Sequence, residues 1–255
     1  MNLVFASGFL VPQRILGIDY FRGLESHLAA VGEHAALFPK VPPLGTLENR
    51  AQALADAIHK KYPQGAVHII AHSMAGLDSR ALISRNLHGL SDPGRIASLT
   101  TVATPHRGSP VADLLVGPRP DDARRLAYDL IRHAIDALGV GTGALADLTA
   151  EGAAKVPDAA QTHPHIRYRS YFAAGRQGLL PTCLVLAPLH HYIRTVTGQD
   201  NDGLVALDSA RYGEFQEPFW RGDHADICGH NLDTADLGGF QFDHLAAFDA
   251  IIRTL

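Results

Sequence analysis

One short stretch, residues 66–77 (AVHIIAHSMAGL), constrains the fold of this chain more than any other. Its first half is a short apolar run of the kind found in buried strands. In its second half small residues surround Ser73, and apolar residues then recur at helical spacing. A strand, a sharp turn that carries a serine, and a helix together predict a nucleophile elbow. The alternative is an ordinary serine that caps a helix at the end of a strand.

The turn departs from the usual Gly-x-Ser-x-Gly pattern, because Ala71 and Ala75 stand where glycine is usual. A methyl group still permits close approach of strand and helix, but alanine resists a positive φ angle. The motif therefore needs support from the rest of the chain before it indicates catalysis.

Strand and helix patterns alternate on both sides of this elbow. Strands are predicted over residues 2–6, 34–38, 99–103 and 167–174, and Thr46 is expected to cap a helix after the second of them. Such alternation predicts an α/β protein with a mostly parallel central sheet and flanking helices. At 255 residues, with no visible boundary, we assign a single domain over 1–255. Residues 176–200 show no clear pattern.

The alternation stops over residues 111–160, which we assign to a lid or cap insertion. Within it, residues 121–138 predict a helix with a broad apolar face, followed by several glycines. Such a helix is either a lid over an apolar pocket or a helix packed permanently on the core, and both alternatives stay open.

A serine nucleophile requires a histidine base and a carboxylate that orients the histidine. Two polar, glycine-marked segments late in the chain supply Asp202 and His224. Together with Ser73 they follow the order Ser, Asp, His that is typical of α/β-hydrolases. The segment Ser7-Gly8-Phe9, directly after the first predicted strand, stands where such enzymes place part of the oxyanion hole, so the N–H of Phe9 is the expected donor.

The chain has 15 histidines, so a histidine in the right half of the chain is weak evidence alone. His230 and His244 are rival bases, although capping or packing at a helix start explains His244. His72 and His106 are expected to have structural roles, with the side chain of His72 directed away from Ser73.

These segments together resemble the bacterial triacylglycerol lipases of the Pseudomonas and Burkholderia type, and the resemblance covers most of the chain. Besides the elbow, it rests on residues 17–23 (GIDYFRG), Arg50, and residues 104–109 (TPHRGS), 148–153 (LTAEGA), 201–205 (NDGLV) and 223–226 (DHAD). The resemblance implies a serine hydrolase, a lipase or esterase, that cleaves carboxylic esters of apolar acyl chains through an acyl-enzyme.

The resemblance also implies a role for each site residue. Ser73 is the nucleophile, His224 the general base and then acid, and Asp202 its orienting carboxylate, with the N–H groups of Phe9 and Met74 as oxyanion donors. It further implies a helical lid between Val111 and about Asp147.

Several features depart from the family pattern. Ser7 stands where the family has histidine, and the chain is short between the lid and Asp202, which predicts a more open pocket. The family's calcium site would lie at Asp226, but His230 stands where the family has glutamine, and calcium prefers oxygen ligands. We therefore predict that no cofactor is required, with calcium as the alternative. The family's disulfide does not map onto the two cysteines of this chain.

Composition and charge limit the classes of partner that this chain is expected to bind. A net charge of −4 without a long basic run argues against nucleic acid, and no apolar stretch is long enough to span a bilayer. No signal peptide is visible, so we expect a cytoplasmic protein, or a secreted one if a leader was removed. The expected partner is a lipid or another apolar ester. The alternatives are a polyester depolymerase of the hydroxyalkanoate type, an acyltransferase, and a catalytically silent protein of this fold that binds a ligand.

Overall fold

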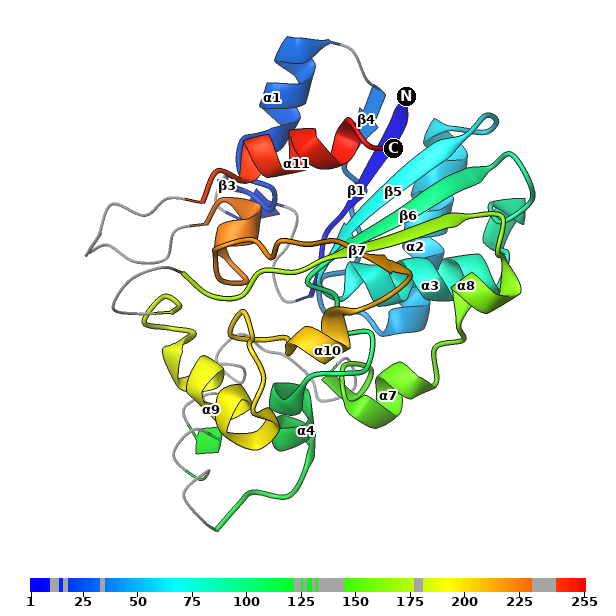
Figure 1. Ribbon diagram of the computed structural model, residues 1–255. Helices are drawn as coiled ribbons and strands as arrows, with labels where there is room; N and C mark the ends of the chain where they lie inside the picture. The colour runs from blue at the N-terminus through cyan, green and yellow to red at the C-terminus, as the bar shows by residue number, and fades with distance from the viewer. Residues whose placement is uncertain are drawn as a thin grey trace.

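The computed structural model describes residues 1–9, 14–15, 18–32, 35–121, 125, 128–129, 132, 145–176, 181–230 and 242–255. A six-stranded sheet in the order β4-β1-β5-β6-β7-β8 forms the centre of the molecule (Figure 1). All its strand pairs are parallel, as the alternating pattern predicts. Its strands are β1 (Asn2–Ala6), β4 (Ala35–Leu37), β5 (Val67–His72), β6 (Ile96–Val102), β7 (Arg167–Tyr171) and β8 (Glu214–Phe215). Two further short strands, β2 (Arg14–Ile15) and β3 (Ile18–Asp19), pair antiparallel.

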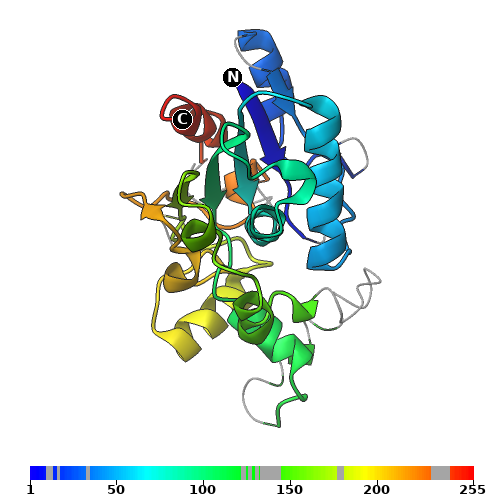
Figure 2. The same ribbon diagram turned by 90° about the vertical axis from the view of Figure 1, so that its right-hand side faces the viewer.

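Helices cover both faces of the sheet (Figures 1 and 2). One face carries α2 (Leu47–Lys61), α3 (Ala75–Ser84) and α8 (Ala159–Thr162), and the other carries α1 (Leu24–Val31) and α11 (His244–Ile252). The remaining described helices are α4 (Pro110–Val116), α7 (Ala150–Ala154), α9 (Ala187–Thr197), α10 (Leu207–Ala210) and the 3-10 turns η1 (Leu87–Gly89) and η2 (Asp226–Cys228). Of these, α4, α9 and α10 lie beyond the carboxyl ends of the strands.

The core follows from the two-residue repeat of a strand that is buried on both faces. In β1, Val4 and Ala6 pack into the cluster under α2 and α3, whereas Leu3 and Phe5 pack into the cluster under α1 and α11. All four are at most 1% exposed. Positions 3–6 of β1 are therefore all apolar, which explains why this part of the strand reads as a continuous apolar run and not as an alternating one.

The cap predicted at Thr46 is confirmed, and the start of α11 is capped in the same way. The hydroxyl of Thr46 accepts the N–H of Asn49 at the start of α2, and the carboxylate of Asp243 accepts the N–H of Ala246 at the start of α11. These bonds satisfy N–H groups that a helix start leaves open.

One segment without a predicted element contains a helix, and one predicted helix lies mostly outside the residues that the structure describes. Residues 176–200, which showed no pattern, contain α9, a helix with proline in its first turn and Gly198 at its end in the left-handed region (φ 70°). Only Leu189 and Ile193 of this helix are buried, so its apolar stripe is short. The helix predicted over residues 121–138 lies almost wholly outside the described residues.

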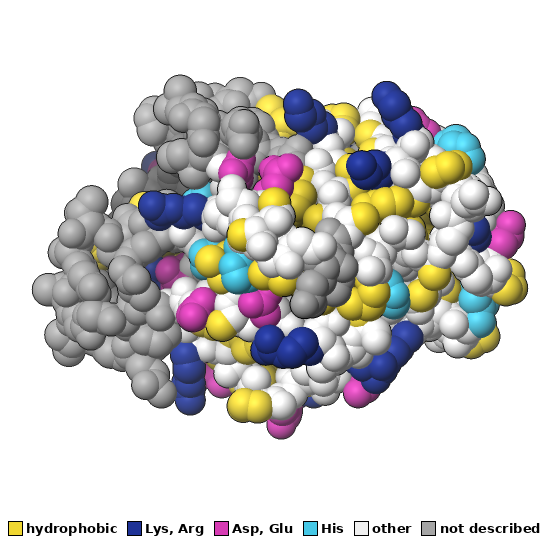
Figure 3. Space-filling view, turned by 90° about the horizontal axis from the view of Figure 1, so that it is seen from above, with side chains coloured by type: hydrophobic (Ala, Val, Ile, Leu, Met, Phe, Trp, Pro, Cys, Tyr) yellow, Lys and Arg dark blue, Asp and Glu magenta, His cyan; other side chains and the backbone are white. Residues whose placement is uncertain are grey.

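The described part of the chain has no helix with the length and apolar character needed to cross a bilayer. On the face seen in Figure 3, among the residues drawn in colour, Lys and Arg side chains are scattered between acidic, polar and apolar ones and do not gather into a patch.

The packing of α3 on the end of β6 yields a stability prediction. A Cβ atom on Gly76 would lie 2.2 Å from Oγ1 and 2.5 Å from Cγ2 of Thr104. We expect Gly76→Ala to lower the free energy of unfolding by about 1–3 kcal/mol through overpacking, measured by urea denaturation. Adding Thr104→Ala removes those two atoms and should recover part of the loss. Equal stability of wild type and Gly76→Ala would contradict the close approach.

Candidate active site

Ser73 occupies a strained turn between β5 and α3. Its φ angle is 59°, in the left-handed region that residues with a side chain rarely adopt. The turn is held by the Ser73 N–H, which donates to the carbonyl of Val102 at 3.0 Å, and by the Thr104 hydroxyl, which donates to the carbonyl of Ser73 at 2.8 Å. Among the described non-glycine residues with positive φ, neither Ala71 nor Ala75 occurs. The strain thus falls on the serine itself, which explains why alanines are tolerated beside it.

His224 and Asp202 lie in direct contact, although 22 positions separate them in sequence. Nδ1 of His224 is 2.7 Å from Oδ2 of Asp202, and the backbone N–H of His224 donates to the carbonyl of Asp202 at 2.9 Å. Asp202 is fully buried and His224 is 8% exposed. Two contacts between the same residues fix both the position and the orientation of the imidazole ring.

The carboxylate of Asp202 is itself held in place by its own loop. Its other oxygen, Oδ1, accepts the N–H groups of Leu204 at 2.9 Å and Val205 at 2.7 Å. Asp202 therefore presents one oxygen to the backbone and the other to His224.

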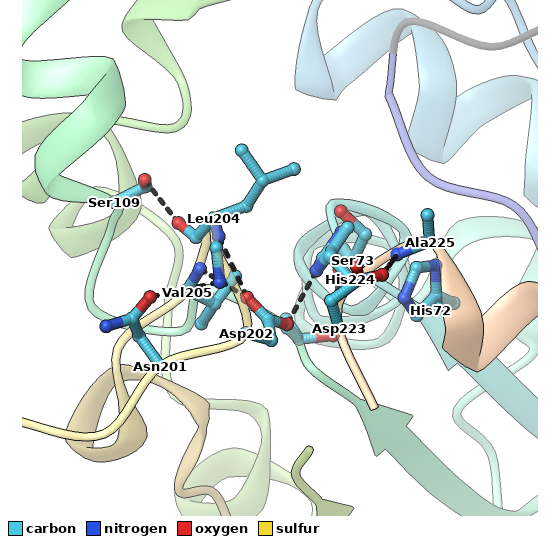
Figure 4. Close-up of polar contacts among 12 residues, drawn as sticks. His72, Ser73, Ser109, Asn201, Asp202, Leu204, Val205, Asp223, His224 and Ala225 are labelled. Carbon is cyan, nitrogen blue, oxygen red and sulfur yellow. Dashed lines mark hydrogen bonds and ion pairs between the residues drawn. The ribbon is translucent and has the colours of Figure 1, made fainter. Parts of the chain in front are cut away.

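Figure 4 shows Ser73 and His72 on the opposite side of the His224 ring from Asp202. The ring centroids of His72 and His224 are 4.5 Å apart. Because His72 directly precedes Ser73, this contact brings the end of β5 next to His224. The structure thus brings together the three residues that the sequence singles out, which come from three separate loops.

His72 takes a larger part in the site than the sequence suggests, since its ring packs against His224. Its Nδ1 lies 2.8 Å from the Tyr20 hydroxyl and 3.2 Å from Sγ of Cys228. Burial, with His224 and His230 close by, holds the pKa of His72 well below its usual range. His72 is therefore neutral, and its packing against His224 adds no like charge. The sequence gives no signal for this contact, because it depends on how separate loops meet.

The rival histidines point elsewhere. Nε2 of His230 lies 2.7 Å from the carbonyl of Tyr20, and Nε2 of His244 lies 2.7 Å from the carbonyl of Arg22. His106 is held by Oγ1 of Thr101 at 3.0 Å, and burial and nearby arginines keep its pKa well below the usual range. These contacts account for all three as structural residues.

His106 also lines a cavity of about 430 Å³ that lies apart from Ser73, Asp202 and His224. Its other lining residues include Arg80, Arg107, Asp158 and Tyr212. The guanidinium of Arg80 lies over the Tyr212 ring and donates to backbone carbonyls at the end of α7. The cavity therefore has a mixed lining, with charged and polar side chains beside the alanines of α7, Val156 and Pro157.

The loop after β1 lies against Ser73. A Cβ atom on Gly8 would be 2.7 Å from Cβ and 3.1 Å from Oγ of Ser73, and 2.7 Å from the Tyr20 hydroxyl. The backbone N–H of Gly8 donates to the Tyr20 hydroxyl, which is also the partner of His72. Only glycine fits this position, and the next residue, Phe9, is the one whose N–H is expected in the oxyanion hole.

Arg50 binds the same loop through the carbonyl of Ser7. Its Nη2 donates to the carbonyl of Ser7 at 2.7 Å, its Nη1 to the carbonyl of Pro42 at 2.8 Å, and its Nε to Oδ2 of Asp78 at 2.9 Å. Arg50 is fully buried and Asp78 is 1% exposed. Burial raises the pKa of Asp78 to about 6, against the opposing effect of Arg50. The guanidinium is thus tied to α3 through one carboxylate and to the loop after β1 through one carbonyl.

Apolar side chains gather beyond the strand ends next to Asp202. Val111 and Leu115 of α4 pack with Leu186 and with Leu189 and Ile193 of α9, and Phe9 and Leu204 lie against them. At the rim of this cluster Val116, Leu184 and Val185 are 42%, 67% and 67% exposed. The surface beside the site is therefore apolar on the side of α4 and α9.

The resemblance implies a calcium site at Asp226. The surroundings of Asp226 do not fit a divalent cation. Both carboxylate oxygens of Asp226 bind the guanidinium of Arg176 at 2.7 Å, and Asp223 lies 3.3 Å from Nη2 of Arg176. Within the described ranges, no cluster of three His, Cys, Asp or Glu side chains is placed to hold a metal. Cys183 and Cys228 are both free and buried.

Comparison with known proteins finds relatives that cover most of the chain. No protein-family model matches. Triacylglycerol lipase 2 of Saccharomyces cerevisiae is 30% identical over 222 residues, which cover 84% of this chain and 63% of the yeast protein. A triacylglycerol lipase of Vibrio cholerae is 26% identical over 253 residues, or 88% of this chain and 78% of that protein. The Staphylococcus hyicus lipase structure matches with a TM-score of 0.69 at 20% identity, over 99% of this chain and 94% of that one.

The chain has the α/β-hydrolase fold. Its sequence relatives support a lipase family, which is a coarser placement than the Pseudomonas and Burkholderia type. The chain spans less than two thirds of the length of the yeast relative.

The raised pKa of Asp78 yields a prediction about stability. The folded state holds the Asp78 proton more tightly than the unfolded chain, where the pKa is near 3.8, so this contribution is full below about pH 4 and is lost as the pH rises through about 6. Relative to Asp78→Asn, wild type should lose roughly 1 kcal/mol of unfolding free energy between about pH 5 and 7. Urea denaturation of both proteins at several pH values measures this difference. A difference that is constant, or that grows in favour of wild type with rising pH, would contradict the raised pKa.

Proposed function

We propose that the protein is a serine hydrolase that cleaves carboxylic esters of apolar acyl chains. The observation that carries the proposal is the meeting of a serine in a left-handed turn with a histidine held at 2.7 Å by a buried carboxylate. The two triacylglycerol lipases among the sequence relatives support the same reaction class.

In this proposal Ser73 attacks the ester carbonyl while Nε2 of His224 takes its proton. Asp202, bonded to Nδ1, keeps the imidazole in the tautomer whose Nε2 is free to accept that proton and stabilises the imidazolium that forms. His224 then passes the proton to the leaving alcohol. A water molecule cleaves the acyl-enzyme by the same steps in reverse order.

The negative oxygen of the tetrahedral intermediate would be held by the N–H groups of Phe9 and Met74. Two observations support these donors. Gly8 lies against Ser73, which brings the N–H of the following residue close to the nucleophile. Met74 lies directly before the first residue of α3, where helix N–H groups have no partner within the helix and carry partial positive charge.

The apolar cluster on α4 and α9 supports an apolar acyl chain as the substrate group, since it lies next to Phe9 and Leu204. The exposed residues Val116, Leu184 and Val185 extend this apolar surface outward, as expected of an enzyme that meets lipid. The finer family placement, the Pseudomonas and Burkholderia type, remains part of this proposal and rests on the sequence segments alone.

A lid between Val111 and about Asp147, within the insertion 111–160, is also part of the proposal. The two ends of such a lid are tied to each other, and one of them is tied to the body of the protein. Asp113 accepts the N–H of Ala150 at 2.9 Å, and Asp147 accepts the N–H of Leu47 at 2.7 Å at the start of α2. Fixed ends are what a segment needs if its middle is to open and close over a site.

The triad is tested by hydrolysis of p-nitrophenyl esters from acetate to palmitate. Ser73→Ala and His224→Ala are each expected to lose nearly all kcat, on the order of 10⁴-fold or more, because each removes a reacting group. His244→Ala, which alters a histidine bonded to the carbonyl of Arg22, is the matched control and should keep wild-type kcat. Loss of activity in the control but not in His224→Ala would overturn the assignment of the base.

The same series separates the alternatives. A peak at short acyl chains indicates an esterase and one at long chains a lipase. A folded wild type that cleaves none of these esters redirects the proposal to a polyester substrate or to a silent binding protein. Transacylated product after addition of an acceptor alcohol identifies an acyltransferase.

A second test concerns the oxyanion loop. Gly8→Ala places a methyl group within contact of Ser73 and Tyr20 and so pushes the loop away from the nucleophile. We expect kcat to fall roughly 100- to 1,000-fold, the typical cost of a lost oxyanion donor, with a much smaller change in KM. Steady-state kinetics measure both, and circular dichroism checks that the variant is folded. Wild-type kcat in a folded Gly8→Ala protein would exclude this loop from the oxyanion hole.

A further inference from the structure

The loop that carries His224 is held by a largely buried arginine from another part of the chain. Arg176 follows the strand extension in which Ala173 bridges to Trp220 and Gly175 bridges to Gly222. This extension therefore runs beside the segment that leads to His224, and Arg176 lies at its end.

The guanidinium of Arg176 makes a two-pronged contact with Asp226. Nε is 2.7 Å from Oδ2 and Nη2 is 2.7 Å from Oδ1, and Nη2 is also 3.3 Å from Oδ2 of Asp223. The exposed fractions of the three side chains are 10% for Arg176, 7% for Asp226 and 0% for Asp223. Such a fork between planar groups is geometrically specific and is stronger than a contact with a point charge.

The two carboxylates also bind the backbone on both sides of His224. Oδ2 of Asp226 accepts the N–H of Asp223, while Oδ1 of Asp223 accepts the N–H groups of Ala225 and Asp226. Oδ2 of Asp223 accepts the N–H of Cys183 at 2.7 Å, which ties the loop to the chain before α9. The backbone of His224 is thus enclosed by hydrogen bonds from its two neighbouring acids.

Two acids buried this close require positive charge. Burial and the nearby Asp226 raise the pKa of Asp223, and Arg176 and two backbone N–H groups oppose this effect. A divalent cation can supply such charge, but here it would compete for oxygens that a guanidinium already binds. We infer that Arg176 is a positioning residue for His224 that fills, with its own guanidinium, the role of a divalent cation at Asp223 and Asp226.

The inference rests on the proposed function, because Arg176 would affect catalysis only through the position of His224 and without contact to the substrate. Removal of the guanidinium leaves two buried acids without their cation and loosens the loop between them. A displacement of about 1 Å at a reacting group costs on the order of 100-fold in rate.

The test compares wild type, Arg176→Ala and the matched control Arg85→Ala, each with EDTA, with calcium chloride, and with low-millimolar guanidinium chloride against equal sodium chloride. Arg85 also pairs with a carboxylate, that of Glu48 at 2.8 Å, but on the exposed surface. Ester hydrolysis and the thermal unfolding temperature are both recorded.

We expect wild type to show no change in kcat or unfolding temperature with EDTA or calcium. Arg176→Ala should lose about 10- to 100-fold in kcat with little change in KM, and free guanidinium ion, but not sodium, should restore part of it. Arg85→Ala should keep wild-type kcat and show no response to guanidinium. If Arg176→Ala does not fold, Arg176→Lys replaces it, because it keeps the charge without the fork.

Three results would overturn the inference. The first is a wild type whose unfolding temperature or kcat falls with EDTA and recovers with calcium. The second is wild-type kcat in a folded Arg176→Ala protein. The third is a loss of kcat in that variant that guanidinium does not reverse. The unfolding temperatures stand apart from ester hydrolysis, so the metal question is answered even if Ser73 and His224 prove inactive.

Discussion

The backbone of Ser73 is the constraint on which the site depends. A residue with a side chain held at a φ of 59° costs about 1–3 kcal/mol and persists only where its surroundings leave no alternative. Those surroundings are the carbonyl of Val102, the hydroxyl of Thr104, and the close approach of Gly76 and Gly8. This backbone conformation directs the side chain of Ser73 away from the end of β5, where the adjacent residues His72 and Met74 are buried. Three segments that are distant in sequence, at residues 8, 73–76 and 102–104, must therefore pack together before the serine can face the loops that hold Asp202 and His224.

Two guanidinium groups, Arg50 fully buried and Arg176 largely buried, fix these loops. Arg50 joins the loop after β1 to α3, and Arg176 joins the His224 loop to the extension of β7. Neither pair is a simple source of stability, because desolvation of a buried ion pair offsets much of its attraction. Their value is geometric, since each planar fork accepts only a narrow range of partner positions. Lysine would supply the charge at either position without that restriction.

Much of this arrangement could be predicted from the sequence. The rest could not, for physical reasons that differ from one element to the next. β1 reads as an apolar run from Leu3 to Ala6, β5 is apolar apart from its two histidines, and Thr46 and Asp243 mark helix starts by their chemistry. Helix α9 was not predicted, because only Leu189 and Ile193 of its 11 residues are buried against the rest of the protein. The order of Ser73, Asp202 and His224 is visible in the chain, but the contacts of Arg176 and His72 are not. Such contacts arise from the meeting of separate loops, which no local pattern encodes.

The pair formed by His72 and His224 shows how the surroundings suit a proton acceptor. In the proposed reaction His224 becomes positively charged while the ring of His72 lies 4.5 Å away. A charged His72 would oppose that step, since like charges at this distance repel strongly away from water. Burial keeps His72 neutral, and the Tyr20 hydroxyl, which also receives the N–H of Gly8, is bonded to its Nδ1. The same tyrosine thus connects the loop after β1 with His72, which ends β5 and packs against the ring of His224. A displacement of any one of these elements would therefore displace the other two.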